Sequence, residues 1–137
     1  MRKLAIDVGE KSLGVCISDK NNIIAIPLKN YFFERFNFEE ASLIILDLLE
    51  KYKDLDTLII GYPLKTNGTK TKATEYVEIF LKYLKAKINQ DIKIFLFDER
   101  FTTKRAEEII KNKKIDYKKN KDLFAAYVML TDYLQKV

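Results

Sequence analysis

The chemistry open to this chain is indicated first by acidic side chains at three unusual places. Asp7 lies inside the apolar run of residues 4–8, where a carboxylate without a partner is costly and a metal ion is one partner that stabilises it. Asp98 and Glu99 follow the apolar run 92–97, and Asp122 stands at the start of a helical pattern. Three carboxylates from distant segments suit Mg²⁺ or Mn²⁺. Two such ions can activate water and stabilise the leaving oxygen in phosphodiester hydrolysis.

Each of these carboxylates also has a purely structural interpretation. Asp7 could end a strand and accept hydrogen bonds from the turn that follows it. Asp98 and Glu99 are adjacent, so on an extended chain they point to opposite faces, and we expect only one of them to face a given site. Asp98, Glu99 and Asp122 could each lead into a helix, where an acidic side chain is favoured by the helix dipole alone.

The residue types that are missing narrow the chemistry further. The 137 residues contain no histidine and one cysteine, Cys16, which excludes Ser-His-Asp and Cys-His catalysis, histidine-ligated metals and an internal disulfide. No apolar run approaches the ~20 residues that span a bilayer, and the N-terminus lacks the pattern of a secretory signal. We therefore expect a single domain over residues 1–137 with no membrane partner.

The charge balance points to a polyanionic partner. The net charge is +5 and the pI is about 9.1, which favours nucleic acid, although 21 of the 25 cationic side chains are lysines (25 minus four arginines). A lysine bias can also follow from nucleotide composition. The candidate nucleic-acid contacts are Arg100, the loop residues Lys65, Asn67 and Thr69, and the lysines Lys118, Lys119 and Lys121.

Each candidate contact has an alternative. Arg100 could hold a phosphate in bidentate geometry or form an internal salt bridge to Asp98. The loop 65–69 could cradle a phosphate or be merely solvated, and the same holds for the lysine-rich run 111–121, which we expect to be mobile without substrate. For the aromatic segment 31–38 we expect core and lid packing rather than a platform for bases.

The elements that must position these residues follow from hydrophobic periodicity. Short apolar segments predict strands at 4–6, 12–18, 23–28, 57–61 and 92–97, and helical spacing predicts helices at 41–52, 76–84, 106–110 and 122–134. Tight turns between the first three strands favour an antiparallel meander. The later strands alternate with helices, which favours parallel pairing and a sheet covered on both faces. The pattern therefore predicts an α/β fold.

Four linked motifs resemble one known family. They are Ala5-Ile6-Asp7-Val8-Gly9 with Gly14-Val15, Ile60-Gly61-Tyr62-Pro63-Leu64 with Asn67-Gly68-Thr69, Asp98-Glu99-Arg100-Phe101-Thr102-Thr103 with Ala106, and Asp122-Leu123-Phe124-Ala125-Ala126. Together they cover nearly the whole chain in order. The sequence is similar to the YqgF family, Holliday-junction-resolvase-like proteins of the ribonuclease H superfamily.

The resemblance implies a five-stranded mixed sheet, three antiparallel strands followed by two parallel ones, flanked by helices. It also implies a cytoplasmic, divalent-metal-dependent nuclease that matures the 5′ end of pre-16S rRNA, with an older proposal of four-way DNA junction resolution. By the same resemblance Asp7, Glu99 and Asp122 are the metal-binding catalytic carboxylates. The chain departs from the family at Glu10-Lys11-Ser12-Leu13-Gly14, where arginine or lysine and then isoleucine usually precede the second glycine. Glu10 is either an extra ligand or without a role there.

Other function classes make different demands. The actin-like ATPase and sugar-kinase fold starts with a similar strand and glycine turn, but it needs two such lobes and this chain supplies one. A non-catalytic nucleic-acid-binding module stays open, and so does the oligomeric state. A junction resolvase needs a symmetric dimer to cut two strands, whereas a monomer favours the processing of structured RNA.

Overall fold

The fold is built on one mixed β-sheet, seen in the computed structural model, which describes residues 1–101 and 120–136. The strand order is β3-β2-β1-β4-β5. β1 pairs antiparallel with β2, and β2 with β3, whereas β4 pairs parallel with both β1 and β5. The strands are β1 (Arg2–Val8), β2 (Ser12–Ser18), β3 (Ala25–Phe32), β4 (Leu55–Tyr62) and β5 (Lys93–Asp98). The expected arrangement of three antiparallel and two parallel strands is confirmed.

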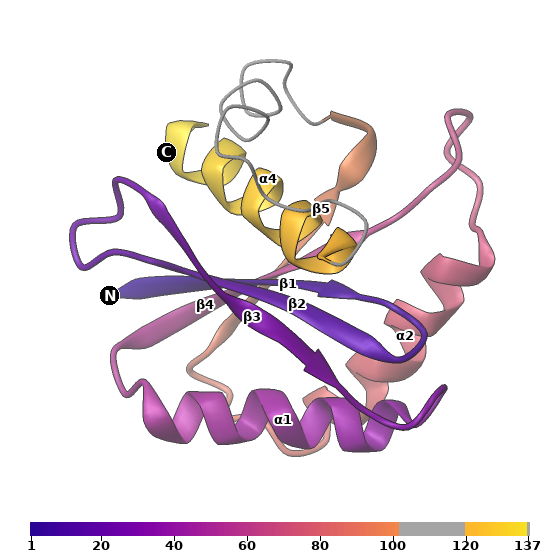
Figure 1. Ribbon diagram of the computed structural model, residues 1–137, viewed down its shortest axis with the longest axis horizontal. Coiled ribbons are helices and arrows are strands. Elements are labelled where there is room, and N and C mark those ends of the chain that lie inside the picture. Colours follow the sequence, from indigo (N-terminus) through magenta and orange to yellow (C-terminus); the bar gives the residue numbers. More distant parts are fainter. Residues whose placement is uncertain (102–119, 137) are drawn as a thin grey trace.

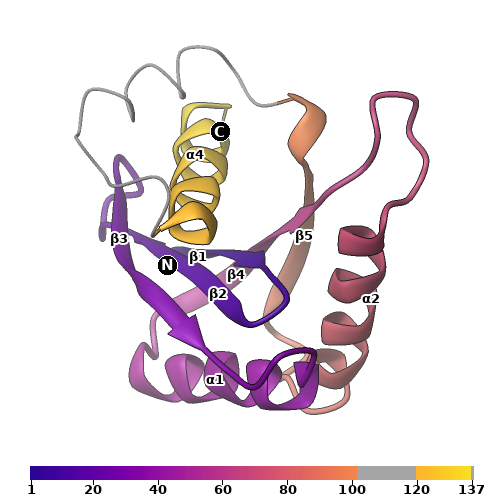
Figure 2. The same ribbon diagram turned by 45° about the vertical axis from the view of Figure 1, so that its right-hand side comes forward.

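The described helices lie on both faces of the sheet. α1 (Phe38–Lys51) and α2 (Lys72–Lys85) lie on one face, and α4 (Lys121–Lys136) crosses the other (Figures 1 and 2). Because side chains alternate along a strand, β1 serves both cores: Ile6 and Val8 join the cluster under α1 and α2, and Ala5 joins the cluster under α4. Asp7 therefore belongs to the face that α4 covers.

Local hydrogen bonds explain where two helices begin. The Asn37 side chain accepts a hydrogen bond from the backbone N–H of Glu40 at 3.1 Å and so starts α1. Thr71 and Thr74 form a reciprocal capping box at the start of α2, and the hydroxyl of Thr74 also donates to the carbonyl of Pro63. These caps extend both helices toward the N-terminus beyond the expected ranges, because a cap lies outside the apolar periodicity.

The third strand differs most from its prediction. Expected at 23–28, it runs over Ala25–Phe32, so Tyr31 and Phe32 belong to the strand and not to the loop that follows. The Asp19 carboxylate accepts hydrogen bonds from the backbone N–H groups of Ile23 and Ile24, at 2.6 and 2.8 Å, and holds these residues in the turn. Pairing with β2 then continues to the end of that strand, where Phe32 lies opposite Ser12.

The segment after β5 begins with a short 3-10 helix, Glu99–Phe101, in which the Asp98 side chain accepts a hydrogen bond from the backbone N–H of Arg100 at 3.0 Å. The helix expected at 106–110 lies outside the described residues, and so do residues 111–119 of the segment 111–121 that was expected to be mobile. Lys121, at the end of that segment, is the first residue of α4. Over 1–101 and 120–136, the helices are all too short or too polar to cross a lipid bilayer.

Candidate active site

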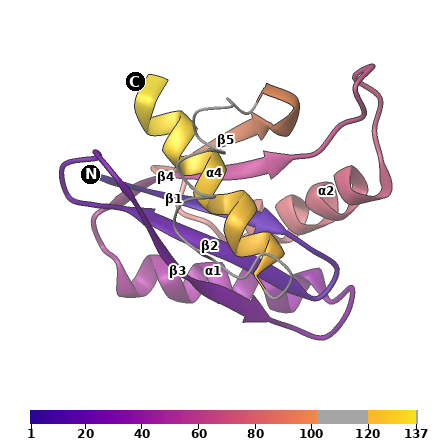
Figure 3. The ribbon, with the colours of Figure 1, turned by 45° about the horizontal axis from the view of Figure 1, so that its top comes forward.

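The three predicted carboxylates come together at one edge of the sheet. Asp7 is the penultimate residue of β1, Glu99 directly follows β5, and Asp122 lies in the first turn of α4. β1, β4 and β5 run parallel, so their carboxyl ends meet at the same edge, and α4 starts above that edge before it crosses β1 and β2 (Figure 3). This is the edge at which open α/β sheets bind their ligands.

Contacts between the carboxyl groups are direct. The Asp7 carboxyl makes hydrogen bonds to the side chains of both Glu99 and Asp122. Burial is the main cause that raises the pKa of Asp7 well above its usual range, and the negative charges of Glu99 and Asp122 raise that pKa further. Burial also raises the pKa of Glu99, against the hydrogen bond from Asp7, which lowers it. The protonated form of Asp7 is thus favoured by its burial and by both acidic neighbours.

Glycines make the room in which these side chains meet. Gly14 of β2 lies directly opposite Asp7 in the register of the sheet, and a Cβ at this position would overlap the backbone of Asp122. A Cβ at Gly61 of β4 would likewise overlap the carboxylate of Glu99. The first turn of α4 can therefore rest on the bare backbone of β2, close to Asp7.

A divalent cation fits the chemistry of this group, although the carboxylates would have to rearrange to hold it. The three carboxyl groups supply oxygen atoms, which are the hard ligands that Mg²⁺ and Mn²⁺ prefer. A cation would also stabilise the anionic form of Asp7, which its surroundings disfavour. In the part of the chain that the structure describes, however, no three acidic, histidine or cysteine side chains are already spaced around a metal position. The carboxyl groups contact one another instead, so a bound ion would take the place of the hydrogen bonds that Asp7 makes to Glu99 and Asp122.

Two polar residues that were not among the predicted site residues hold the start of α4 in place. The hydroxyl of Ser12 donates a hydrogen bond to Oδ2 of Asp122. Asn30 of β3 donates to the side-chain oxygen of Asn120, just before α4, at 3.1 Å. Ser12 is two residues from Gly14 and so shares its face of β2. That spacing is the signal in the sequence that could have identified it.

Loss of the Ser12 hydroxyl is expected to weaken the site without unfolding the protein. Groups that orient metal ligands typically contribute about 10- to 100-fold to metal affinity or activity. We therefore expect Ser12→Ala to raise the Mn²⁺ concentration needed for half-maximal cleavage by about tenfold, and Ser12→Thr, which keeps the hydroxyl, to restore it. A metal titration of cleavage tests this expectation. Equal metal requirements for Ser12→Ala and the unaltered protein would contradict it.

Arg100 adopts the internal salt bridge that was one of its two interpretations. Its Nε lies 3.0 and 3.1 Å from the two oxygens of Asp98, and Nη2 lies 2.7 Å from Oδ2. Arg100 holds the pKa of Asp98 below its usual range. Nη1 also donates to the carbonyl of Thr66 at 3.3 Å and so ties the end of β5 to the loop 65–69. A phosphate contact by Arg100 stays a prediction, and it would compete with Asp98.

The other predicted nucleic-acid contacts that the structure describes lie near the same edge of the sheet. Lys65, Asn67 and Thr69 are exposed in the loop between β4 and α2, which projects beyond the sheet in Figure 2. Asn67 accepts hydrogen bonds from the backbone and hydroxyl of Thr69, at 3.1 and 2.7 Å, so the loop has a defined shape. Lys121 is exposed next to Asp122. Lys118 and Lys119 lie outside the described residues.

Glu10, the departure from the expected motif, is engaged elsewhere. Its carboxylate lies 2.9 Å from Nη2 of Arg35, and both side chains are exposed. The backbone carbonyl of Glu10 accepts a hydrogen bond from the N–H of Phe36 at 2.8 Å. The glutamate therefore anchors the loop before α1, and its contacts do not include the three carboxylates.

Comparisons with known proteins find relatives along nearly the whole chain. The family described as "RuvX: Holliday junction resolvase" matches residues 1–136. A protein of Mycoplasmopsis pulmonis named "Putative pre-16S rRNA nuclease" is 42% identical over 138 residues, which cover 98% of this chain and 92% of the relative. Relatives of the same name from Ureaplasma parvum and a Sulfurihydrogenibium species are 40% and 35% identical, and the matches cover 99% of this chain and 97% and 91% of the relatives.

Solved structures show the same fold at low sequence identity. RuvC of Thermus thermophilus in complex with a Holliday junction substrate superposes with a TM-score of 0.69 at 12% identity, covering 99% of this chain and 94% of RuvC. The nuclease domain of the human cytomegalovirus terminase superposes with a TM-score of 0.50 at 14% identity, covering 96% and 82%. The family model matches nearly the whole chain, and the sheet is ribonuclease H-like. This chain therefore belongs to the RuvX family, which is the family that its motifs resemble and that was called YqgF above.

Proposed function

We propose that this chain is a divalent-metal-dependent nuclease that hydrolyses phosphodiester bonds and processes the 5′ end of pre-16S rRNA in the cytoplasm. The observation that carries the proposal is the contact between Asp7, Glu99 and Asp122, which reach one point from β1, the end of β5 and the start of α4. The names of its relatives in Mycoplasmopsis and Ureaplasma support the choice of substrate.

In this proposal the three carboxylates hold Mg²⁺ or Mn²⁺ and are the catalytic residues. When bound, the metal supplies a hydroxide-like nucleophile and neutralises charge on the leaving oxygen. Asp7 gives up its shared proton so that all three side chains are anionic, and Ser12 keeps Asp122 turned toward Asp7. Arg100 and the exposed lysine Lys121 provide positive charge beside the site for the phosphates of the substrate strand.

Cleavage of a panel of labelled substrates tests the proposal. The panel contains a pre-16S rRNA fragment, single-stranded RNA and a four-way DNA junction, each with Mg²⁺, Mn²⁺ or EDTA. We expect metal-dependent cleavage of the rRNA fragment, and its loss in Asp7→Asn, Glu99→Gln and Asp122→Asn. Asp47→Asn, the same change on the exposed side of α1, is the matched control. Full activity in all three site variants would contradict the assignment.

Junction resolution is the second candidate, because the matching family is described as a Holliday junction resolvase. It requires cleavage of the four-way DNA in preference to the rRNA fragment, by a symmetric homodimer. The same panel, together with sedimentation of the free protein, distinguishes the two substrates. Binding without cleavage of any substrate would leave the chain as a nucleic-acid-binding module.

Binding of Mg²⁺ is expected to release a proton from the site. Asp7 keeps its proton at pH values where an ordinary aspartic acid has lost it, whereas a carboxylate must be deprotonated to bind a metal. The apparent affinity for Mg²⁺ should therefore increase with pH and become constant above the raised pKa of Asp7. Calorimetric titrations in buffers of different ionisation enthalpy measure the number of protons released. A count of zero in mildly acidic buffer would contradict this expectation.

A further inference from the structure

One aromatic side chain of β3 is unusually exposed beside the candidate active site. The side chains of Phe33 and Phe38 are buried in the core, as expected for the aromatic segment 31–38, but Phe32 is 69% exposed. Phe32 is the last residue of β3, which is an edge strand of the sheet. The core therefore gives no reason for a phenylalanine at this position.

The register of the sheet places Phe32 on the same face as the carboxylates. Phe32 pairs with Ser12, and Asn30 pairs with Gly14. Directly opposite residues of an antiparallel pair share a face and lie about 5 Å apart at their Cβ atoms. Because the Ser12 hydroxyl bonds to Asp122, Phe32 stands on the α4 side of the sheet, one strand away from this carboxylate.

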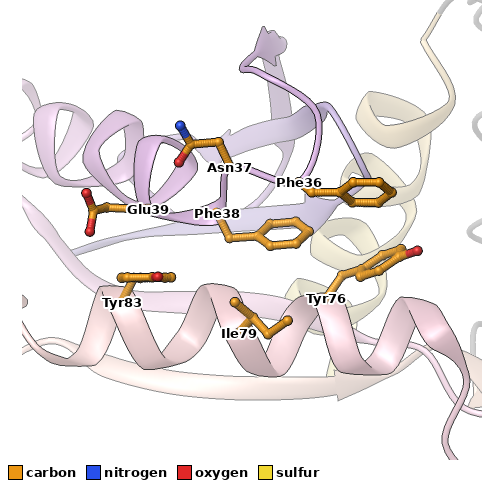
Figure 4. A pocket seen from close by; sticks show the side chains of 7 residues that line it. All are labelled: Phe36, Asn37, Phe38, Glu39, Tyr76, Ile79 and Tyr83. Carbon is orange, nitrogen blue, oxygen red and sulfur yellow. The ribbon is translucent and has the colours of Figure 1, made fainter.

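Among the described residues, neither an aromatic ring nor a cation covers the Phe32 ring. Phe36 is different, because the Arg35 guanidinium lies 4.8 Å from its ring centroid and the Tyr76 ring lies at 5.5 Å. Figure 4 shows Phe36 beside Tyr76 at the end of the groove between α1 and α2.

We propose that Phe32 is a stacking platform for an unpaired base of the substrate strand, next to the phosphate that is cleaved. The inference rests on the proposed nuclease function and extends it to a base-binding site. A nucleobase is the occupant that fits, because the ring shares a face with the carboxylates and exposed lysines precede both Ser12 and Asp122, at Lys11 and Lys121. Single-strand binding usually combines an exposed aromatic ring, on which any base can stack, with cationic side chains that attract the backbone.

Binding of a short single-stranded RNA in EDTA, measured by fluorescence anisotropy, tests the platform without cleavage. We expect Phe32→Ala and Phe32→Leu each to weaken binding about tenfold, because leucine keeps the apolar bulk but not the aromatic face, and Phe32→Trp to bind at least as well as the unaltered protein. Ile23→Ala is the matched control, since Ile23 is 71% exposed in the turn at the opposite end of the sheet. Urea unfolding verifies that the variants stay folded.

A second RNA separates stacking from general attraction. In it, abasic sites replace the bases along the strand, and we expect Phe32→Ala to bind this RNA as well as the unaltered protein does. A fluorescent adenine analogue in the intact strand should be quenched by the unaltered protein and not by Phe32→Ala.

Equal binding of the intact RNA by Phe32→Ala and the unaltered protein would overturn the inference but leave the nuclease proposal in place. A change in sedimentation with unchanged RNA binding would overturn it in favour of a contact between two copies of the chain. Absence of RNA binding by the unaltered protein would overturn the inference, whereas the nuclease proposal is decided separately by cleavage with Mg²⁺ or Mn²⁺.

Discussion

Replacement of Asp7 by asparagine is expected to abolish cleavage and, at the same time, to stabilise the metal-free protein. Loss of a metal ligand that acts in the transition state should reduce the cleavage rate by at least about 100-fold, equivalent to roughly 2.7 kcal/mol. The stabilisation has a separate cause. Folding buries the Asp7 carboxyl against two other acidic side chains, so its ionised form is disfavoured in the native state. Asparagine has no charge to disfavour.

The pH dependence of this stabilisation follows from the direction of the pKa shift. Above a pH of about 4, Asp7 ionises in the unfolded chain but keeps its proton in the folded one, because its folded pKa is raised. The folded state then binds more protons, so its stability decreases as the pH rises through this range. We expect the advantage of Asp7→Asn to be absent at low pH, to increase up to the raised pKa, and to be constant above it.

Urea unfolding at several pH values, in EDTA, measures this difference. Asp98→Asn is the control, because the pKa of Asp98 is shifted in the opposite direction. Arg100 lowers this pKa and so favours the ionised form of Asp98 in the folded protein. Asp98→Asn should therefore bring no gain in stability at neutral pH. If Asp7→Asn proves less stable than the unaltered protein at neutral pH, the carboxylates do not repel one another as the structure implies.

The second large effect is expected from Gly14→Ala, which alters no polar group. The added methyl group would overlap the backbone of Asp122, so α4 must shift away from β2. Overpacking of this kind costs about 1 to 3 kcal/mol, and it moves Asp122 away from Asp7. We expect a lower free energy of unfolding together with a loss of cleavage of at least about 100-fold.

Gly9→Ala provides the comparison for this prediction. Its methyl group would meet the carboxylate of Asp122, 2.6 Å from Oδ2, and not the backbone of the helix. A side-chain end can rotate away, so we expect Gly9→Ala to reduce cleavage with a smaller loss of stability. Thermal unfolding and cleavage of the same substrate, measured on both variants, distinguish the two cases. Wild-type stability and activity in Gly14→Ala would show that α4 does not rest on this residue.

Much of the fold could be predicted from the sequence, because each element carries its own pattern. The run Thr57-Leu58-Ile59-Ile60-Gly61 is apolar at almost every position, as a strand buried on both faces requires, and it forms the greater part of β4. The end of β3 could not be predicted in this way. Tyr31 and Phe32 continue the strand through pairing with β2, a long-range contact that leaves no periodicity of its own.

Only part of the candidate active site could be predicted from the sequence. The ends of the elements point to Asp7, to Asp98 or Glu99, and to Asp122, and the resemblance to the family selects Glu99. The structure brings Asp7, Glu99 and Asp122 into contact, while their catalytic roles stay predictions. The roles of Ser12 and Phe32 depend on register. A shift of one residue would turn both side chains to the other face, so their position beside Asp122 is known only once β1, β2 and β3 are aligned.

Direct titration with Mn²⁺, followed by electron paramagnetic resonance of the free ion, tests most directly whether the three carboxylates form one metal site. We predict that the unaltered protein binds Mn²⁺ and that Asp7→Asn, Glu99→Gln and Asp122→Asn each lose most of this binding, while Asp47→Asn retains it. Mn²⁺ binding that is equally strong in all of these proteins, or absent from the unaltered one in the presence of RNA, would contradict the account.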